Sequence, residues 1–387
     1  MKEFTTFEAL LKPITKELLE SSVRSFDSDY YSKTFKTYDH LLVLLYAQLH
    51  DLKSLRDLEI AFNSQKELQK LLNFSAVSRS TLSDANARRP AACFLWIAEQ
   101  LMSLLPRQQR KEVNKVVRKL DSSPIQLKGR GYNEWTLANK TLRCQGMKLH
   151  VEYDHEVGAP TRIELSQANV DDCSMGQRWP IMPDTIYVFD KGYYDFNWWW
   201  SIQSKGAFFV TRLKKNAAIK ITQRNTVIGD VILEDHLFLF KNKTPRGGKR
   251  NLYQQELRHV SVKREGKEPL ILVTNLLDIP AELISELYKE RWEIELFFKW
   301  IKQNLRIKKF LGKSENAVKT QIAIALILYL LIALFNLNEP TKRSMHQLLI
   351  WLRHNYTLVF PHYRLLKPPE YLLPISKLGR SFLDAHF

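Results

Sequence analysis

The chain has 387 residues, which suggests two or three domains and a sizeable core. It is 45% hydrophobic and 11% aromatic, with only 13 Gly and 15 Pro, and this composition excludes a disordered or fibrous protein. The 3 cysteines form no C-x-x-C pair, so the sequence supports neither a disulfide framework nor a cysteine zinc site. The start, MKEFTTFEALLKP, lacks an apolar signal segment, and we expect a cytoplasmic protein.

The charge is high and unevenly placed. The sequence has 58 Lys and Arg against 41 Asp and Glu, a net charge of +17, which favours a polyanionic partner. Residues 1–105 contain 13 basic and 13 acidic side chains, so the rest of the chain carries the whole excess. Three basic clusters lie there, at residues 106–119, 241–250 and 288–313. Each alone could be a solvated surface, but together they favour nucleic acid over an acidic membrane.

Residues 1–105 have helical apolar spacing and few strand signals, which predicts an all-helical N-terminal domain. Residues 78–90 follow another helical segment and could form the second helix of a helix-turn-helix, with Ser78 or Ser80 as its N-cap. An ordinary helical hairpin explains the same pattern. If the element contacts DNA, its candidate basic residues are Arg79, Arg88 and Arg89.

After Pro106 the pattern changes to short apolar strands, and the segment 106–340 is predicted to form a second, mixed domain. The predicted strands are residues 113–120, 148–154, 161–165, 185–190, 207–213, 226–233, 236–240, 253–262 and 269–274. A helix is predicted at 194–204, capped by Asp195, and helices resume at Pro280 and continue to 338. Residues 341–387 are predicted to form a C-terminal tail region.

Three carboxylates stand out by position among the 41 acidic residues. Asp121 and Asp190 each end a predicted apolar strand, and Glu295 lies in a long basic helix. Such side chains could converge on divalent metal, and Mg²⁺ suits them because it prefers oxygen ligands. Two ions about 4 Å apart can activate the attacking oxygen and stabilise the leaving oxygen of a phosphodiester.

The segment around Glu295 gives a geometric test. On one continuous helix, Tyr288, Arg291, Glu295 and Lys302 would share an arc of about 60°. Basic groups there would hold phosphates beside the carboxylate. Lys299 lies on a neighbouring stripe and is a further candidate DNA contact, whereas a solvated helix with incidental ion pairs is the alternative. The apolar residues that can seat the helix on a core are Ile294, Phe297, Phe298 and Ile301.

The run Tyr288-Lys-Glu-Arg291-Trp-Glu-Ile-Glu295, continued to Lys302, resembles the Tyr, Arg, Glu, Lys signature of the IS-four (insertion sequence four) family of bacterial DDE transposases. The segments FDKGYY (189–194) and VTNL (273–276) are also similar to that family's conserved blocks. The resemblance covers about residues 113–335, and the helical N-terminus is similar to the amino-terminal domain of many members. Only LDSSPIQL supports the first acidic position, Asp121.

The resemblance implies an α+β or α/β fold: an RNase H-like catalytic core, a mixed sheet flanked by helices, with a β-rich insertion at about 214–268. It implies that Asp121, Asp190 and Glu295 are catalytic and bind Mg²⁺, for which Mn²⁺ can substitute. Tyr288, Arg291 and Lys302 would contact double-stranded DNA at the inverted-repeat ends of the element. The released 3′-hydroxyl would then attack target DNA in a cut-and-paste reaction, with the protein a homodimer in the DNA complex.

Two other functions remain open. An RNase H-like metal nuclease without strand transfer would use the same residues, and a non-catalytic DNA-binding remnant of a transposase would share the basic charge. The apolar run 322–335 has 14 residues, short of the roughly 20 that cross a bilayer, so we expect a buried helix and no membrane partner. Trp198 to Trp200 could stack on a base but are more typical of a core, and His150 and His155 are expected to be structural or surface groups.

Overall fold

A computed structural model describes residues 5–139, 144–227, 229–241, 250–305, 310–338 and 343–357. Its N-terminal part is helical, as predicted. The helices are α1 (Thr6–Leu11), α2 (Lys16–Phe26), α3 (Thr37–Leu49), α4 (Leu55–Ser64), α5 (Lys66–Leu71), α6 (Arg79–Arg88) and α7 (Ala91–Ser103). Side-chain oxygens of Thr5, Thr15, Ser54 and Ser78 accept hydrogen bonds from backbone N–H groups in the first turns of α1, α2, α4 and α6.

The candidate helix-turn-helix differs from its prediction. Ser78 caps α6 as expected. However, α5 lies between α4 and α6, so the two helices are not joined by the short turn that defines the motif. Arg89, predicted to point towards DNA, is buried instead: its guanidinium donates to the carbonyls of Ser28 and Phe35. The α6 segment is therefore part of a helical cluster rather than a standard helix-turn-helix.

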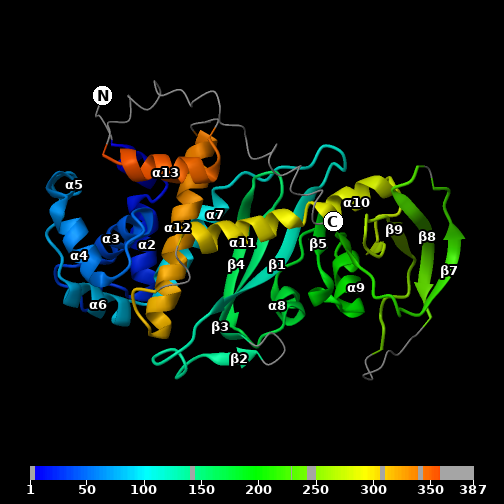
Figure 1. Cartoon of the computed structure of the whole chain (residues 1–387), viewed down its shortest axis with the longest axis horizontal. Helices are drawn as coiled ribbons and strands as arrows, with labels where there is room; N and C mark the ends of the chain where they lie inside the picture. Colours follow the sequence, from blue (N-terminus) through cyan, green and yellow to red (C-terminus); the bar gives the residue numbers. More distant parts are fainter. Residues whose placement is uncertain are drawn as a thin grey trace.

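A mixed sheet follows the helices along the chain (Figure 1). Its strands are β1 (Val116–Gln126), β2 (Leu137–Asn139), β3 (Cys144–Asp154), β4 (Ala159–Gln167), β5 (Thr185–Phe189), β6 (Phe208–Arg212), β7 (Ile219–Arg224), β8 (Ile232–Phe240), β9 (Leu257–Val262) and β10 (Leu270–Thr274). The order is β2-β3-β1-β5-β6-β10-β9-β8-β7, with β4 also paired to β3. β1 is antiparallel to β3 but parallel to β5, and β5 is parallel to β6.

This arrangement confirms the predicted RNase H-like core: three antiparallel strands, then two that run parallel to the first. Two strand predictions were wrong in detail. β1 does not end at Asp121 but continues to Gln126, because its second half still pairs with β3. Residues 226–233 are mostly a connection, in which Gly229 has a φ of +85° that turns the chain between β7 and β8.

Short helices fill the crossovers between the strands. They are α8 (Asp172–Arg178), the 3₁₀ turn η1 (Lys191–Tyr193) and α9 (Phe196–Ser204), the last capped by Asp195 as predicted. Trp198 and Trp199 of α9 are buried in an aromatic core with Phe189 and Phe209. The core interpretation of these tryptophans is confirmed.

The basic helix predicted across residues 288–302 is two helices. α10 (Ala281–Lys289) ends before α11 (Trp292–Asn304), and a tight turn at residues 290–291 joins them. The amides of Arg291, Glu293 and Ile294 bond the carbonyls three residues earlier rather than four, which tightens the chain there. Tyr288 therefore belongs to α10 and does not share a continuous stripe with Glu295.

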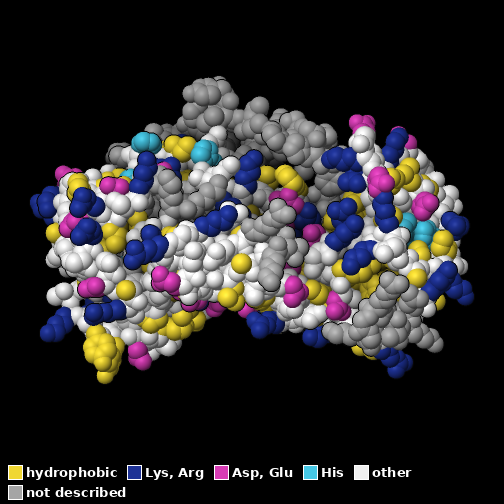
Figure 2. Space-filling model, turned by 60° about the horizontal axis from the view of Figure 1, so that its bottom comes forward, with side chains coloured by type: hydrophobic (Ala, Val, Ile, Leu, Met, Phe, Trp, Pro, Cys, Tyr) yellow, Lys and Arg dark blue, Asp and Glu magenta, His cyan; other side chains and the backbone are white. Residues whose placement is uncertain are grey.

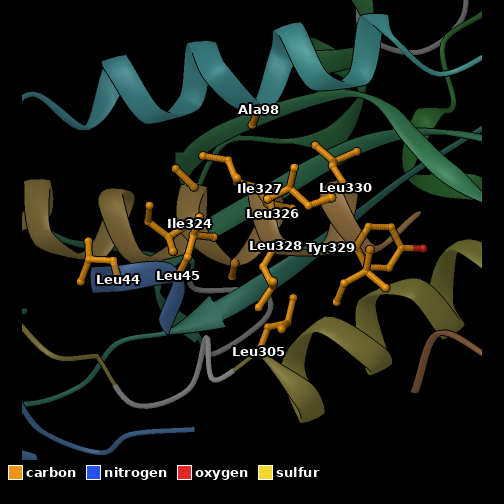
Figure 3. Close-up of a cluster of buried hydrophobic side chains, with 14 of the residues drawn as sticks. Leu44, Leu45, Ala98, Leu305, Ile324, Leu326, Ile327, Leu328, Tyr329 and Leu330 are labelled. Carbon is orange, nitrogen blue, oxygen red and sulfur yellow. The ribbon is translucent and has the colours of Figure 1, made fainter. Parts of the chain in front are cut away.

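The largest apolar core surrounds α12 (Glu315–Asn338), which packs against α3, α7, α6 and α1 (Figure 3). Figure 3 shows Leu44 and Leu45 of α3, Ala98 of α7 and Leu305 around the side chains of α12. The helix is long and apolar enough to cross a bilayer, but 94% of that stretch is buried inside the protein. The prediction of a buried helix at 322–335 is confirmed.

This core crosses the predicted boundary at residue 105, because α12 follows the sheet in sequence but packs among the N-terminal helices. The boundary itself stays a prediction. Within 214–268, β7, β8 and β9 extend the same sheet at one edge. The basic cluster 241–250 lies almost wholly outside the described residues. Of the tail region, residues 343–357 are described, and α13 (Met345–Asn355) packs on α12, α3 and α1.

Candidate catalytic site and DNA-facing residues

The sheet register places Asp121 beside Asp190. In the parallel pair β1 and β5, the last paired residues are Leu120 and Phe189, so the next residue on each strand is one of the two aspartates. Asp190 keeps an extended backbone at the end of β5. Its carboxylate accepts a hydrogen bond of 2.7 Å from the amide of Gly192. Two carboxylates far apart in sequence thus meet at one edge of the core.

Arg291 joins the third carboxylate to this pair. Its guanidinium donates from Nη1 to Asp121 Oδ2 at 2.9 Å and from Nη2 to Glu295 Oε1 at 2.5 Å. Glu295 lies on the first turns of α11, one turn after Arg291, and α11 packs against β1. The structure therefore brings together all three predicted carboxylates, with a partly buried arginine between two of them.

The electrostatics at Asp121 reflect this crowding. Burial, together with the negative charges of Asp190 and Glu295, raises the pKa of Asp121 to about 7, although the positive charge of Arg291 lowers it. The single positive charge of Arg291 does not fully offset burial and the two neighbouring carboxylates. A divalent cation at the site would supply further positive charge, and the three oxygen donors suit Mg²⁺. The residues present thus fit the metal that the sequence predicts.

An open hollow of about 440 Å³ begins at two of these carboxylates, Asp121 and Glu295. It is lined by Asp121, Ser122, Ser123, Glu295, Phe298, Lys299, Lys302 and Gln303. Lys302 donates to the hydroxyl of Ser123 at 2.6 Å, and Lys299 is exposed. Both predicted basic residues of α11 therefore border the same hollow as the carboxylates. The opposite side of α11 seats it on the core through Ile294, Phe297, Phe298 and Ile301, as predicted.

A fourth carboxylate, Asp172, was missed by the sequence reasoning. Its Oδ1 accepts hydrogen bonds from Ser122 Oγ at 2.6 Å and from Lys148 Nζ at 3.1 Å. A Cβ atom at Gly192 would lie 2.9 Å from Asp190 Oδ1 and 3.2 Å from Asp172 Oδ2, so a larger residue there would displace the Asp190 carboxylate. No spacing rule marks Asp172, because it is the first residue of the short helix α8.

Buried ion pairs hold the start of α11 against β1. Lys119, with a side chain 0% exposed, donates to Glu293 Oε2 at 2.6 Å, and the same carboxylate lies 3.0 Å from Nδ1 of His155. Arg110 pairs with Glu290 at the turn between α10 and α11. These contacts fix the position of Arg291 and Glu295 relative to the strand that carries Asp121.

Tyr288 is placed differently from its prediction. Its side chain is 5% exposed and belongs to the apolar cluster under α10. The guanidinium carbon of Arg291 lies 5.9 Å from the centre of the Tyr288 ring, which is a cation–π distance. The structure thus places Tyr288 as a support for Arg291, and its direct contact with DNA stays a prediction. His150, by contrast, is the buried structural group that was expected, with Nε2 2.8 Å from Ser166 Oγ.

The predicted N-terminal DNA contacts lie on exposed positions. Arg79 and Arg88, at the two ends of α6, are both exposed. Arg88 borders a hollow of about 550 Å³ that also includes the exposed pair Tyr30 and Tyr31 and the side chain of Lys33. Figure 2 shows that Lys and Arg side chains on one face cover both the helical part and the sheet part.

Known proteins share this chain's sequence and fold. Residues 114–331 match the family described as "Transposase DDE domain", and residues 2–74 match a domain of unknown function. A putative transposase of Sinorhizobium fredii is 39% identical over 65% of this chain and 69% of its own length. A probable transposase for an insertion sequence of Geobacillus stearothermophilus is 26% identical over 89% of this chain and 88% of its own length.

A putative transposase for an insertion sequence of Synechocystis, named IS4SA, is 26% identical over 75% of this chain and 82% of its own length. The fold resembles the piggyBac transposase in a cryo-EM structure of its synaptic complex with hairpin DNA. The TM-score is 0.50 at 11% identity, covering 98% of this chain and 85% of that one. The family match spans more than half of the chain and includes Asp121, Asp190 and Glu295. The chain therefore belongs to the DDE transposases, of the kind encoded by insertion sequences of the IS-four type.

Proposed function

We propose that this transposase cuts DNA at the ends of its own insertion sequence and joins the released 3′-hydroxyl to target DNA, with Asp121, Asp190 and Glu295 as its catalytic carboxylates. One observation carries the proposal: the parallel register of β1 and β5 places the two aspartates side by side, and Arg291 connects Asp121 to Glu295. A structural ion-pair network needs no such concentration of negative charge at an open hollow.

The three carboxylates would hold Mg²⁺, in the form of two ions, and Mn²⁺ could replace it. The bound metal would activate the attacking oxygen and stabilise the leaving oxygen of a phosphodiester. The elevated pKa of Asp121 supports this assignment, because burial and the neighbouring carboxylates raise it in the absence of a cation. Asp172 would help to position the residues around Asp121 through its hydrogen bonds with Ser122 and Lys148.

The cationic side chains would hold the DNA. Arg291 lies among the carboxylates with its side chain 17% exposed, and its guanidinium would attract a phosphate oxygen at the site. Lys302 and Lys299 border the hollow and would contact the phosphates of the transposon end. Tyr288 would position Arg291 and, as predicted from the sequence, act on the same strand of the end.

A second DNA contact is proposed for the helical part. Arg79 and Arg88 of α6 are exposed, and the hollow beside Arg88 carries two exposed tyrosines, Tyr30 and Tyr31. Arginine beside exposed aromatic rings is typical of nucleic-acid surfaces. This region would recognise the inverted repeat, which the carboxylate site alone cannot do. The piggyBac transposase was solved as a synaptic complex with hairpin DNA, which supports DNA binding by this chain. We propose further that the chain acts on DNA as a homodimer, in the cytoplasm.

The deciding experiment incubates the full-length protein with linear DNA that carries the inverted repeats flanking its gene, together with a supercoiled target plasmid and Mg²⁺. The transposase proposed here gives both cut ends and end-to-target joints. A metal nuclease without strand transfer gives cut ends and no joints. A DNA-binding remnant gives a shifted band and no cut, and either of the last two results would overturn the proposed function.

A further inference from the structure

A pair of buried histidines lies at the far edge of the sheet, in the strands between Asp190 and Glu295 of the chain. His236 of β8 and His259 of β9 are cross-strand partners, and their rings stack 4.1 Å apart at an interplanar angle of 14°. Their exposed fractions are only 3% and 5%. In Figure 1 these strands lie at the opposite end of the molecule from α4 and α5.

The ring nitrogens of this pair are unsatisfied. Both Nδ1 and Nε2 of His236 and Nδ1 of His259 are buried without a hydrogen-bond partner among the described residues. A buried polar atom left without a partner costs about 1–3 kcal/mol, so three of them on two touching rings need an explanation. A neutral imidazole keeps one nitrogen lone pair, which can bind a metal ion.

A carboxylate completes the group. Glu234 lies two residues before His236 on β8, so its side chain points to the same face of the sheet. One ligand atom from each of Glu234, His236 and His259 lies within 4.8 Å of the other two. Glu234 is exposed, so its side chain can rotate towards the histidines, and an ion can enter from solvent.

We propose that Glu234, His236 and His259 form a second metal site, which takes Zn²⁺ or a similar borderline divalent transition metal. Two neutral imidazoles and one carboxylate are a common zinc donor set and leave a fourth position for water. Mg²⁺ is a poor ligand match because it prefers oxygen donors and ideal octahedral geometry. Because a metal ion lies in the plane of an imidazole that binds it, the two stacked rings would rotate out of their parallel arrangement to bind one ion. The ion would then use the unpaired lone pairs and cross-link β8 to β9.

The site is separate from the catalytic carboxylates. Four strand-to-strand steps separate β1 from β9 in the sheet order, which corresponds to about 19 Å at the usual strand spacing. It therefore cannot share an ion with Asp121 or Asp190. Its expected effect is on the stability of the strands between β6 and α10, not on the chemistry of phosphodiester cleavage.

The test is a titration of zinc-free, full-length protein with Zn²⁺, followed by isothermal calorimetry. The buffer contains excess Mg²⁺, which occupies the carboxylate site. We expect one zinc equivalent to bind wild-type protein and to raise its melting temperature. His236→Gln and His259→Gln should each lose that equivalent, and Glu234→Gln should bind more weakly. His346→Gln, which changes an exposed histidine outside the group, is the matched control and should bind as wild type does.

X-ray absorption spectroscopy of zinc-loaded wild-type protein is a second test, which does not depend on the folding of any variant. Scattering from two imidazole rings is expected at the zinc. Failure of wild-type protein to bind zinc, an unchanged stoichiometry in both histidine variants, or a zinc shell without imidazole would each overturn the proposal. Circular dichroism of the variants without metal distinguishes loss of the site from loss of the fold.

Discussion

The neighbouring helices α11 and α12 are held in different ways. α12 is surrounded by apolar side chains, and its residues from Ile322 to Ile332 are almost fully buried. α11 buries one face, but its other contacts are polar and directional: Arg291 to Asp121, Glu293 to Lys119 and Lys302 to Ser123. Apolar packing has no direction, whereas hydrogen-bonded pairs fix one side chain relative to another. The helix that carries Glu295 is therefore the one that polar contacts align with β1.

The largest expected effects concern the proposed catalytic carboxylates, which α11 brings together with β1. We predict that Asp121→Asn, Asp190→Asn and Glu295→Gln each reduce cleavage of element ends by at least about a hundredfold, the usual cost of removing one well-placed electrostatic group. End binding without metal should persist, because no phosphate contact is removed. Cleavage is measured in Mg²⁺ and binding by gel shift.

The matched control for these variants is Asp278→Asn, which removes the same charge from an exposed position and should cut normally. Normal cleavage by Asp121→Asn would show that the first acidic position is assigned wrongly. Loss of cleavage in Asp278→Asn would show that net charge, and not the site, controls the assay.

The ion pair under α11 should respond asymmetrically to mutation. Lys119 is fully buried, whereas the side chain of Glu293 is 38% exposed. Glu293→Ala leaves the buried Lys119 ammonium without the carboxylate that it bonds, and should lower the free energy of unfolding by about 3–5 kcal/mol. Lys119→Met should cost less, because the stranded carboxylate of Glu293 can still reach water. Urea unfolding of both variants measures the difference.

The double variant Lys119→Met/Glu293→Leu should recover most of the stability lost in Glu293→Ala, since no unpaired charge remains. The exposed pair Lys16 and Glu20 is the control, and Glu20→Ala should change stability by under about 1 kcal/mol. Equal losses for Lys119→Met and Glu293→Ala would contradict the account of α11.

For α12 we expect a loss of stability when a cavity is made in the core. Leu326 is 0% exposed at the centre of the shared core, so Leu326→Ala should lower the free energy of unfolding by about 2–5 kcal/mol. The helical part and the sheet should unfold together, because the same core contains residues of both. The measurement is thermal unfolding followed by circular dichroism and by tryptophan fluorescence.

Ile350→Ala is the control, since Ile350 is 40% exposed on α13 and should matter little. Separate transitions in Leu326→Ala would show that the two parts are independent. The shared core has a practical consequence: deletion of residues 1–105 would expose α12, so such a fragment cannot serve to test what the helical part contributes to DNA binding.

Much of the site could be predicted because local sequence determines it. Asp190 follows a five-residue apolar strand, and Glu295 lies on a helix with a clear apolar face, so both positions follow from short-range patterns. The prediction that Asp121 ends a strand was wrong, because Asp121 lies in the middle of β1. It still reached the site, because the parallel pairing with β5 stops at the residue before it.

What could not be predicted depends on contacts distant in sequence. Lys119 and Glu293 are 174 residues apart, and Asp172 and Ser122 are 50 apart, so no periodicity connects them. The turn between α10 and α11 contains neither Gly nor Pro, and helical spacing continues through it. Two adjacent arginines, Arg88 and Arg89, look alike in sequence, yet only the structure shows that the second is buried.

The smallest expected effects concern the two proposed DNA surfaces, and they are read from the salt dependence of binding. Each phosphate contact contributes about 0.9 to the slope of log affinity against log salt. Lys302→Ala, on α11, and Arg88→Ala, on α6, should therefore each lower the slope by about one unit if each side chain contacts a phosphate. Lys16→Ala removes the same charge from an exposed site on α2 and should leave the slope unchanged.

Arg291→Ala gives a different signature, which separates the two kinds of cation. Arg291 already neutralises Asp121 and Glu295, so its removal loses a phosphate contact and also exposes DNA to two unpaired carboxylates. Its affinity should fall more than that of Lys302→Ala, and Mg²⁺ should restore part of the loss.

The titrations use end DNA and random duplex, with and without metal. A lower slope for Lys302→Ala on both duplexes, with a loss of end preference only in Arg88→Ala, would show that α11 binds phosphates and that α6 recognises the end sequence. Unchanged slopes for Lys302→Ala and Arg291→Ala would mean that this side of α11 does not contact DNA at all.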